Sequence, residues 1–224
     1  MFRETRCIIL DFDGVIADTE TLHFETFASV LAEEGIVLSR AVNDREYIGI
    51  DVYQSFTKAF SDAGRTLDRA LRASLVARKC RRFQDRLGEV QLFPGAREYV
   101  AEASRRVPLA IGSGGIRIEI RGILRRHGLE GAVRYLVTAD DGLRSKPDPE
   151  VYLRALALVR AGECPDLKPC ECLVVEDSIP GIEAARRAGM RCLALAHSHP
   201  PADLAAADLV LASFAEWRWE GGAR

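Results

Sequence analysis

The sequence predicts an α/β fold with a mostly parallel sheet, and two patterns carry this prediction. From about residue 92 onward, short apolar or β-branched runs alternate with segments of helical periodicity. Alternation of this kind is typical of a parallel sheet with helices on both faces. Residues 16–91, by contrast, contain no convincing strand and follow directly after the first apolar run. We therefore expect a helical block inserted after the first strand.

The first strand and the inserted block come first in the chain. Cys7–Leu10 is a continuous apolar run, as expected for a buried strand. In the block, Phe24, Phe27 and Leu31 recur at helical spacing, and Gly35 would end that helix. Two further helical stretches are expected, at residues 53–63 and 67–87.

Glycine and proline mark the element ends in the rest of the chain. Gly128 would end a helix that starts near Ile116, and Pro149 precedes another. Pro108 sits near the start of its strand, where a missing donor is tolerated. The expected strands are residues 107–111, 135–137, 172–175, 191–196 and 208–211, and the expected helices are residues 98–103, 116–127, 150–159 and 181–188.

The composition excludes several classes of function. The chain has 224 residues, of which 48% are hydrophobic and 29% charged, as in ordinary globular proteins. The net charge is −2, so the chain lacks the excess of positive charge that is typical of nucleic-acid-binding proteins. We interpret the basic run at residues 78–82 as a solvated helix face. No apolar stretch is long enough to span a bilayer, so we expect no membrane partner. The oligomeric state stays open, and a monomer is compatible with the sequence.

The six cysteines favour a reducing compartment. Cys7 and Cys192 fall in apolar, strand-like runs and are expected to be buried thiols. Cys164, Cys170 and Cys172 do not have the spacing of a structural zinc site. The first strand begins at Cys7, which leaves no room for a signal peptide. We therefore expect a cytoplasmic protein.

Two carboxylates at the end of the first strand are the most informative feature. Asp11 and Asp13 follow the buried strand, and Gly14 allows the backbone to turn sharply or to approach a ligand closely. Two crowded acids repel each other unless a cation or a shared proton relieves them. This pattern indicates a metal site, an acid/base pair or a nucleophile, although Asp and Gly also end strands in simple turns.

The later strands deliver complementary groups to the same edge of the sheet, where ligands bind in open α/β folds. Gly112–Gly115 places Ser113 and small residues at a helix N-terminus, which suits an anion. Lys146–Pro149 holds a lysine between prolines, and Glu176 and Asp177 follow the fourth strand of the core. Each group alone has an ordinary structural explanation. Their convergence at one edge favours a functional site.

We interpret one further motif, at residues 197–199, as a structural loop and not as a functional site. Residues 197–199 read His-Ser-His, which suggests metal binding. Because two prolines follow at once, we expect an exposed loop there instead.

The chain resembles the haloacid dehalogenase superfamily of phosphohydrolases. The motifs that carry this resemblance, in the family's order, are Asp11–Val15, Ser113, Lys146–Glu150, Val174–Ser178 and Gly181–Ala185. The resemblance implies a Rossmann-like parallel sheet core, with the first strand central and flanked by the second and fourth. Residues 16–91 look like the family's small helical cap, and residues 1–15 and 92–224 look like its catalytic core. Residues 18–23 are similar to the β-phosphoglucomutase and phosphatase branch.

The resemblance also implies roles for individual residues. Asp11 would be the nucleophile that forms an aspartyl-phosphate, and Asp13 would be the general acid and then the general base. Ser113, the Gly114 amide and Lys146 would hold the transferring phosphoryl group.

The cofactor implied by the resemblance is Mg²⁺. Asp11, the backbone carbonyl of Asp13 and Asp177 would supply oxygen ligands. Glu176 would ligate directly or through water. The ion would also explain how the acidic cluster is tolerated.

Substrate choice is expected to depend on the cap. His23 is either a substrate-binding residue or a packed helix histidine, and residues 47–49 with Tyr53 are candidates for a loop that faces the substrate. Mutases of this type have an arginine three residues after the glycine that corresponds to Gly49, where this chain has Val52. Arg82 or another arginine of the cap is the alternative holder of a second phosphate.

These observations favour a Mg²⁺-dependent phosphatase for a small phosphorylated metabolite such as a sugar phosphate. Asp13 favours a phosphate ester over a haloacid, because halide displacement needs no proton donor. The first alternative is a phosphosugar mutase of the β-phosphoglucomutase type. A non-catalytic phosphometabolite-binding protein is the second, although binding alone would not need both Asp11 and Asp13.

Overall fold

A computed structural model describes residues 4–47 and 50–218. It contains a six-stranded parallel sheet of order β5-β4-β1-β6-β7-β8 and a two-stranded antiparallel ribbon of β2 and β3. The strands are β1 (Cys7–Leu10), β2 (Ala17–Asp18), β3 (Gln91–Leu92), β4 (Leu109–Gly112), β5 (Tyr135–Val137), β6 (Cys172–Glu176), β7 (Arg191–Leu195) and β8 (Leu209–Leu211). The predicted α/β class is confirmed, with β1 central between β4 and β6.

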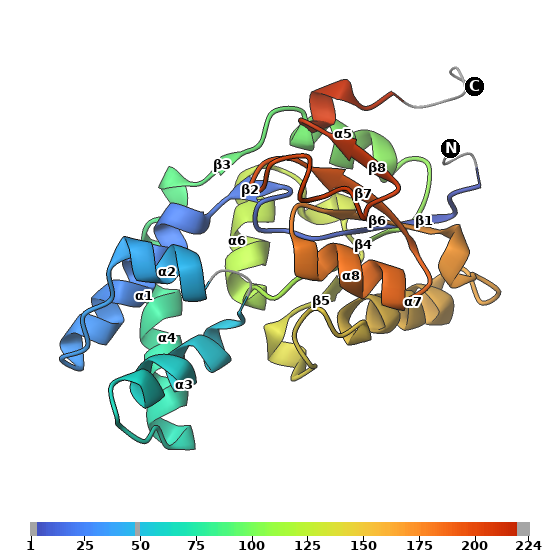
Figure 1. The fold of residues 1–224 in the computed structure, drawn as a ribbon. Coiled ribbons are helices and arrows are strands. Elements are labelled where there is room, and N and C mark those ends of the chain that lie inside the picture. Colours follow the sequence, from blue (N-terminus) through green and yellow to red (C-terminus); the bar gives the residue numbers. More distant parts are fainter. Residues whose placement is uncertain (1–3, 48–49, 219–224) are drawn as a thin grey trace.

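Helices cover both faces of the six-stranded sheet (Figure 1). The helices are α1 (Glu20–Glu33), α2 (Arg40–Glu46), α3 (Val52–Asp62), α4 (Arg69–Asp85), α5 (Ala96–Ala103), α6 (Arg117–Arg126), α7 (Glu150–Gly162) and α8 (Ile179–Arg187). Side chains of β1 alternate between the faces. Ile8 and Leu10 pack with α5 and α6, whereas Cys7 and Ile9 pack with α7 and α8.

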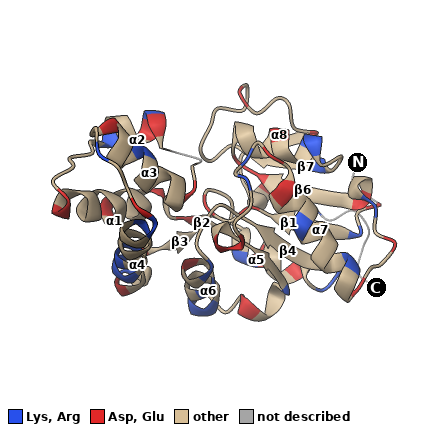
Figure 2. Cartoon of the chain, turned by 90° about the horizontal axis from the view of Figure 1, so that it is seen from below, with Lys and Arg blue, Asp and Glu red and all other residues tan. Residues whose placement is uncertain are grey.

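The helical block α1–α4 lies beside the carboxyl ends of the strands (Figure 1). It has a hydrophobic cluster of its own, which includes Phe27, Phe56 and Leu75. Ile116, which precedes α6, packs into this cluster, and Phe83 of α4 packs into the main core. The block and the sheet therefore interlock through α4 and α6, which lie side by side (Figures 1 and 2).

Two elements of this region differ from the sequence-based expectation. The ribbon pairs Ala17 with Leu92 and Asp18 with Gln91, where the chain leaves the sheet layer and where it returns. Our statement that residues 16–91 hold no strand is therefore wrong at both ends, because two-residue strands show no periodicity. Helix α2 was also missed, although Ser39 caps it by accepting a hydrogen bond from the Val42 amide.

The boundaries of the other elements agree with expectation to within a few residues. Cys7 and Cys192 are buried free thiols, as expected. In the part of the chain that the structure describes, no helix combines the length and apolar character needed to cross a membrane.

Candidate active site

An acidic cluster lies at the carboxyl ends of the neighbouring strands β1 and β6. The Asp11 amide donates to the Val175 carbonyl at 2.9 Å, so the Asp11 side chain emerges where the sheet ends. Asp11, Glu176 and Asp177 are buried, and each has a carboxylate oxygen within 4.8 Å of the others. The two acidic motifs are therefore brought together, as the strand order predicts.

Lys146 lies inside this cluster. Its Nζ is 2.9 Å from Asp11 Oδ1 and 2.6 Å from Glu176 Oε1. Glu176 Oε1 also accepts a hydrogen bond from the Tyr152 hydroxyl at 2.6 Å. The other oxygen, Oε2, accepts from the Asp177 and Ser178 amides at 2.9 and 3.0 Å. Both oxygens of Glu176 are thus engaged within the protein, and Glu176 anchors the lysine.

The cluster carries more negative charge than Lys146 can balance. Burial raises the pKa of Asp11 to about 7, with Lys146 opposing this shift and Glu176 adding to it. Burial, together with the charges of Glu176 and Asp11, raises the pKa of Asp177 well above its usual value. Although burial alone would lower it, the neighbouring carboxylates raise the pKa of Lys146. A bound cation would relieve this repulsion.

The donor set fits a hard divalent cation, because every candidate ligand atom is a carboxylate oxygen. Gly14 has a φ of +78°, and a Cβ added there would overlap the Asp177 carboxylate. Glycine is therefore required at this turn, both for its conformation and for the room it leaves beside Asp177.

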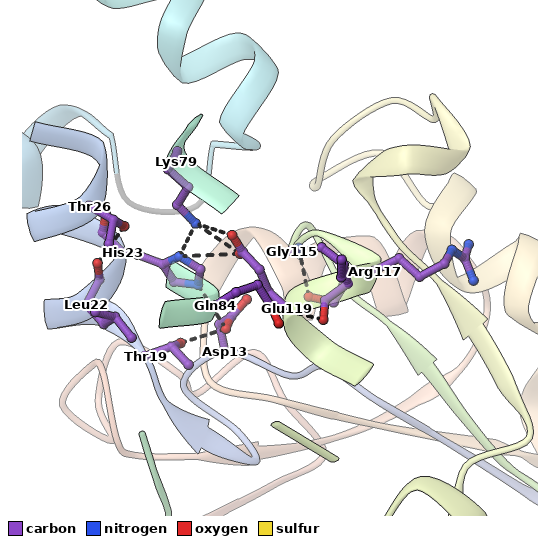
Figure 3. A network of polar contacts seen from close by, with 12 residues as sticks. Asp13, Thr19, Leu22, His23, Thr26, Lys79, Gln84, Gly115, Arg117 and Glu119 are labelled. Atoms are coloured by element: carbon purple, nitrogen blue, oxygen red, sulfur yellow. Dashed lines mark hydrogen bonds and ion pairs between the residues drawn. The ribbon is translucent and has the colours of Figure 1, made fainter. Parts of the chain in front are cut away.

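The Asp13 carboxylate contacts side chains of the helical block (Figure 3). Asp13 Oδ1 accepts a hydrogen bond from Thr19 Oγ1 at 2.6 Å and lies 3.2 Å from His23 Nε2. His23 Nδ1 lies 2.7 Å from Lys79 Nζ, and the ring stacks on Phe83 with 4.7 Å between the ring centroids. Burial raises the pKa of Asp13, but the interactions with His23, Thr19 and Lys79 outweigh it, and the net shift is downward.

The loop that carries Ser113 also borders the site. Ser113 is buried at the end of β4, and its Oγ accepts from the Gly115 amide at 3.0 Å. A Cβ added to Gly115 would lie 2.8 Å from Asp13 Oδ2 and 3.3 Å from Ser113 Oγ. The serine hydroxyl and the Asp13 carboxylate therefore border the same glycine, and Gly114 is exposed beside them.

These groups line one cavity of about 1160 Å³ between the sheet and the helical block. Its wall includes the predicted site residues Asp11, Asp13, His23, Ser113, Gly114, Lys146 and Asp177. Glu176 is fully buried and is not part of the wall. The opposite wall includes Tyr47, Val52 and Tyr53, whereas Ile48 and Gly49, which we expected in this loop, lie outside the described residues.

Residues 197–199 lie in a loop, as expected, but only Ser198 is exposed. His197 and His199 are half-buried, and all three residues of the His-Ser-His motif border the cavity. His197 Nδ1 lies 2.8 Å from the Gly14 carbonyl, and the Ser198 hydroxyl donates to Asp177 Oδ2. The segment is therefore not a free loop, and its contacts hold the backbone and one carboxylate of the acidic site.

Three further residues contact the predicted site residues or their partners, although no sequence pattern marked them as part of the site. Lys79 is 3% exposed, so our interpretation of residues 78–82 as a solvated helix face is wrong for this residue. Its partner Glu119, on α6, is 1% exposed. Tyr152 looks like any apolar-face aromatic of α7, and only the structure shows its hydroxyl on Glu176.

Known proteins share this architecture. Residues 8–195 match the family described as haloacid dehalogenase-like hydrolase. A phosphorylated carbohydrates phosphatase of Thermotoga maritima is 32% identical over 195 residues, which cover 85% of each chain. The β-phosphoglucomutase of Bacillus subtilis is 28% identical over 211 residues, covering 92% of this chain and 88% of the mutase.

Solved structures agree with the sequence comparisons. The crystal structure of CbbY from Rhodobacter sphaeroides in complex with phosphate superposes with a TM-score of 0.82 at 25% identity. The superposition covers 95% of this chain and 96% of CbbY. With the family match spanning most of the sequence and the acidic cluster at the expected strand ends, the chain belongs to the haloacid dehalogenase-like hydrolases.

Proposed function

We propose that this hydrolase is a Mg²⁺-dependent phosphatase that acts on a small phosphorylated metabolite of the sugar-phosphate class. One observation carries the proposal. Asp11, Asp13, Lys146 and Ser113 all line one cavity. Phosphoryl transfer needs a nucleophile, a proton donor and positive groups around the phosphate, and these residues provide each of them.

In the first half-reaction, a carboxylate oxygen of Asp11 attacks phosphorus and the ester P–O bond breaks. Asp13 must carry a proton at this stage, although its contacts lower its pKa in the free protein. It gives this proton to the leaving oxygen, and an aspartyl-phosphate remains on Asp11. In the second half-reaction, Asp13 takes a proton from the water that attacks this phosphorus. Inorganic phosphate leaves, and Asp11 and Asp13 return to their starting states.

Lys146, Ser113 and the Gly114 amide hold the phosphoryl oxygens in this scheme. Lys146 is fixed by Asp11 and Glu176, so its position is set before the substrate arrives. Preorganised donors of this kind stabilise charge that develops in the transition state.

Asp11, Asp177 and the Asp13 carbonyl are the proposed ligands of Mg²⁺, with Glu176 acting through water. Glu176 receives the indirect role because both of its oxygens are already hydrogen-bonded. When bound, the ion neutralises part of the charge on the carboxylates and on the phosphate.

We further propose that residues 16–91 form a cap domain over a core of residues 1–15 and 92–224. Polar contacts join the two parts across the cavity. Gln54 Nε2 donates to Ser145 Oγ at 2.9 Å, and the Ser145 hydroxyl donates to Asp51 Oδ2 at 2.8 Å. The cap would shield the reaction from bulk water, and its wall, including His23, would contact the part of the substrate beyond the phosphate.

The names of the relatives support phosphorylated carbohydrates as substrates, since both a carbohydrate-phosphate phosphatase and a phosphoglucomutase are similar to this chain. The mutase alternative differs only in the acceptor of the phosphoryl group, which is a sugar hydroxyl instead of water. Val52 favours the phosphatase, because it offers no charge to hold a second phosphate at that position, and Arg82 binds Ser29 and Glu33 outside the cavity wall. Arg40, Arg45 and Arg72 line the cavity and keep the mutase as the alternative.

The test is a phosphate-release screen over metabolite phosphate esters, with Mg²⁺ and with EDTA. We expect turnover of at least one sugar phosphate only with Mg²⁺, and no turnover by Asp11→Asn. Near wild-type rates in Asp11→Asn would show that another residue is the nucleophile. Isomerised sugar phosphate from glucose 1-phosphate and its bisphosphate would favour the mutase. A complete lack of turnover would favour the non-catalytic binding protein.

A further inference from the structure

Glu119 is a buried carboxylate with no role in the reaction proposed above. It is the third residue of α6, a helix that otherwise carries four arginines and no acid. Its Oε1 and Oε2 lie 3.0 and 2.9 Å from Nζ of Lys79, which lies on α4. Figure 2 shows these two basic helices next to each other, at the contact between the helical block and the sheet layer. The buried ion pair therefore joins the two parts.

Lys79 uses its remaining donor on His23. An ammonium group has three N–H donors and no acceptor, so the His23 Nδ1 that lies 2.7 Å away must accept. This assigns the ring proton to Nε2, which faces Asp13 Oδ1 at 3.2 Å. Figure 3 shows the resulting chain of contacts, from Glu119 through Lys79 and His23 to Asp13.

The contacts of Lys79 make its position depend on Glu119. Two of its three polar contacts go to the Glu119 carboxylate, and the third goes to His23. A lysine side chain is long and flexible, and it keeps one geometry only when partners hold it. Without Glu119, the ammonium group can turn away from His23 Nδ1, and the Asp13 carboxylate is then the remaining described partner that favours a proton on Nε2.

We propose that Glu119 is a positioning residue for Asp13, acting through Lys79 and His23. This inference rests on the proposed function, because it gives Asp13 the task of proton transfer. Loss of the Glu119 carboxylate would loosen the His23 hydrogen bond and leave Asp13 held by Thr19 alone. The Asp13 carboxyl would then be misaligned for transfer to the leaving oxygen, whereas Asp11 and Lys146 would keep their positions.

The test separates proton transfer from phosphoryl transfer. Glucose 6-phosphate has an alkoxide leaving group that needs a proton, and p-nitrophenyl phosphate has a leaving group that departs without one. We would measure kcat/KM for both esters in the wild type and in Glu119→Gln, with Mg²⁺ present. Gln84→Ala is the matched control, because Gln84 also joins α4 to α6, by a 3.0 Å bond to the Ile118 carbonyl, and does not touch the chain of contacts.

For Glu119→Gln we expect kcat/KM to fall about tenfold or more with glucose 6-phosphate, since general acid catalysis contributes 10²–10⁴-fold. With p-nitrophenyl phosphate the loss should stay within about twofold, because that step takes no proton from Asp13. The Gln84→Ala control should affect both esters to a similar, small extent.

A second variant, Lys79→Met with Glu119→Leu, replaces the ion pair by apolar groups of similar size. Such replacements commonly preserve stability, so we expect a Tm close to that of the wild type. The loss with glucose 6-phosphate should persist, because His23 then has no partner on Nδ1.

Equal losses with the two esters in Glu119→Gln would overturn the inference, and so would recovery of the glucose 6-phosphate rate in the double variant. Either result would assign Glu119 a purely structural role while the wild type still turned over both esters. Where the wild type turns over another sugar phosphate of the screen, that ester takes the place of glucose 6-phosphate in this comparison. A wild type that hydrolyses no ester of the screen is a different failure, which removes the proposed function and this inference with it.

Discussion

The buried charge of Asp11 predicts that Asp11→Asn stabilises the metal-free protein at pH 8 but much less at pH 5. Burial raises the pKa of this carboxyl to about 7, from an ordinary value of 3.8. The folded state therefore holds the proton more tightly than the unfolded state. The free energy of unfolding must fall as the pH rises through this window, and it levels off above pH 7.

The magnitude follows from the size of the shift. At 1.36 kcal/mol per pKa unit, ionising Asp11 in the folded state costs about 4 kcal/mol in total. By proton linkage, the free energy of unfolding of the wild type falls by roughly 2–3 kcal/mol between pH 5 and pH 8. Asparagine cannot ionise, so the variant escapes the cost. It also removes one of the charges that raise the pKa of Asp177, which acts in the same direction.

The assay is urea unfolding in EDTA at pH 5, 6, 7 and 8, with Asp85→Asn as the control. Asp85 is an exposed aspartate at the end of α4, away from the cluster. The advantage of Asp11→Asn over the wild type should grow by about 2 kcal/mol or more from pH 5 to pH 8. Parallel curves for Asp11→Asn and the wild type would refute the reasoning. Mg²⁺ at pH 8 should stabilise the wild type far more than the variant.

Three further outcomes follow from the contacts of the cluster. Lys146→Met leaves Glu176 buried without its cation, so the free energy of unfolding in urea should fall by about 3–5 kcal/mol. A fall of less than about 1 kcal/mol would show that the ion pair does not stabilise the fold. In Gly14→Ala, the new Cβ overlaps the Asp177 carboxylate, and the half-saturating Mg²⁺ concentration for phosphate release should rise about tenfold with circular dichroism unchanged. Asp177→Ala should raise that concentration still further, and an unchanged metal titration would exclude Asp177 from the site.

The sequence was sufficient to predict the sheet and the groups at its edge. Asp11, Ser113, Lys146 and Asp177 each follow a strand or lie in a loop at a strand end. The parallel arrangement brings such ends together whatever the details of helix packing. The assignment of strands from apolar runs therefore also located most of the candidate site.

The contacts that hold those groups could not be predicted in the same way. Lys79 and Glu119 are 40 residues apart, and they meet only because α4 packs against α6. In the sequence, one belongs to a basic run and the other to an arginine-rich helix, and both patterns are typical of solvated surface. The hydroxyl of Tyr152 poses the same difficulty, because an aromatic residue on the apolar face of a helix usually signals packing alone.

The role of Glu176 shows a different limit of sequence reasoning. Its position beside Asp177 suggests a pair of equivalent carboxylates. The structure distinguishes them, because Glu176 accepts from Tyr152 and from two backbone amides while Asp177 borders the cavity. Adjacent acids in a motif can thus have separate tasks, one holding the lysine and one facing the ligand.

The origin of each contact suggests a division of labour between the two parts of the chain. The groups proposed to hold the phosphoryl group lie at the end of β4 and in the Lys146 loop, and the proposed nucleophile and metal ligands follow β1 and β6. The groups that orient the Asp13 carboxylate, namely Thr19, His23 and Lys79, come from residues 16–91. Substitutions of the groups that attack or hold the phosphoryl group should therefore impair all phosphate esters alike. Substitutions around Lys79 should impair esters according to the proton demand of their leaving groups, and the two classes can be told apart by comparing alkyl with aryl esters.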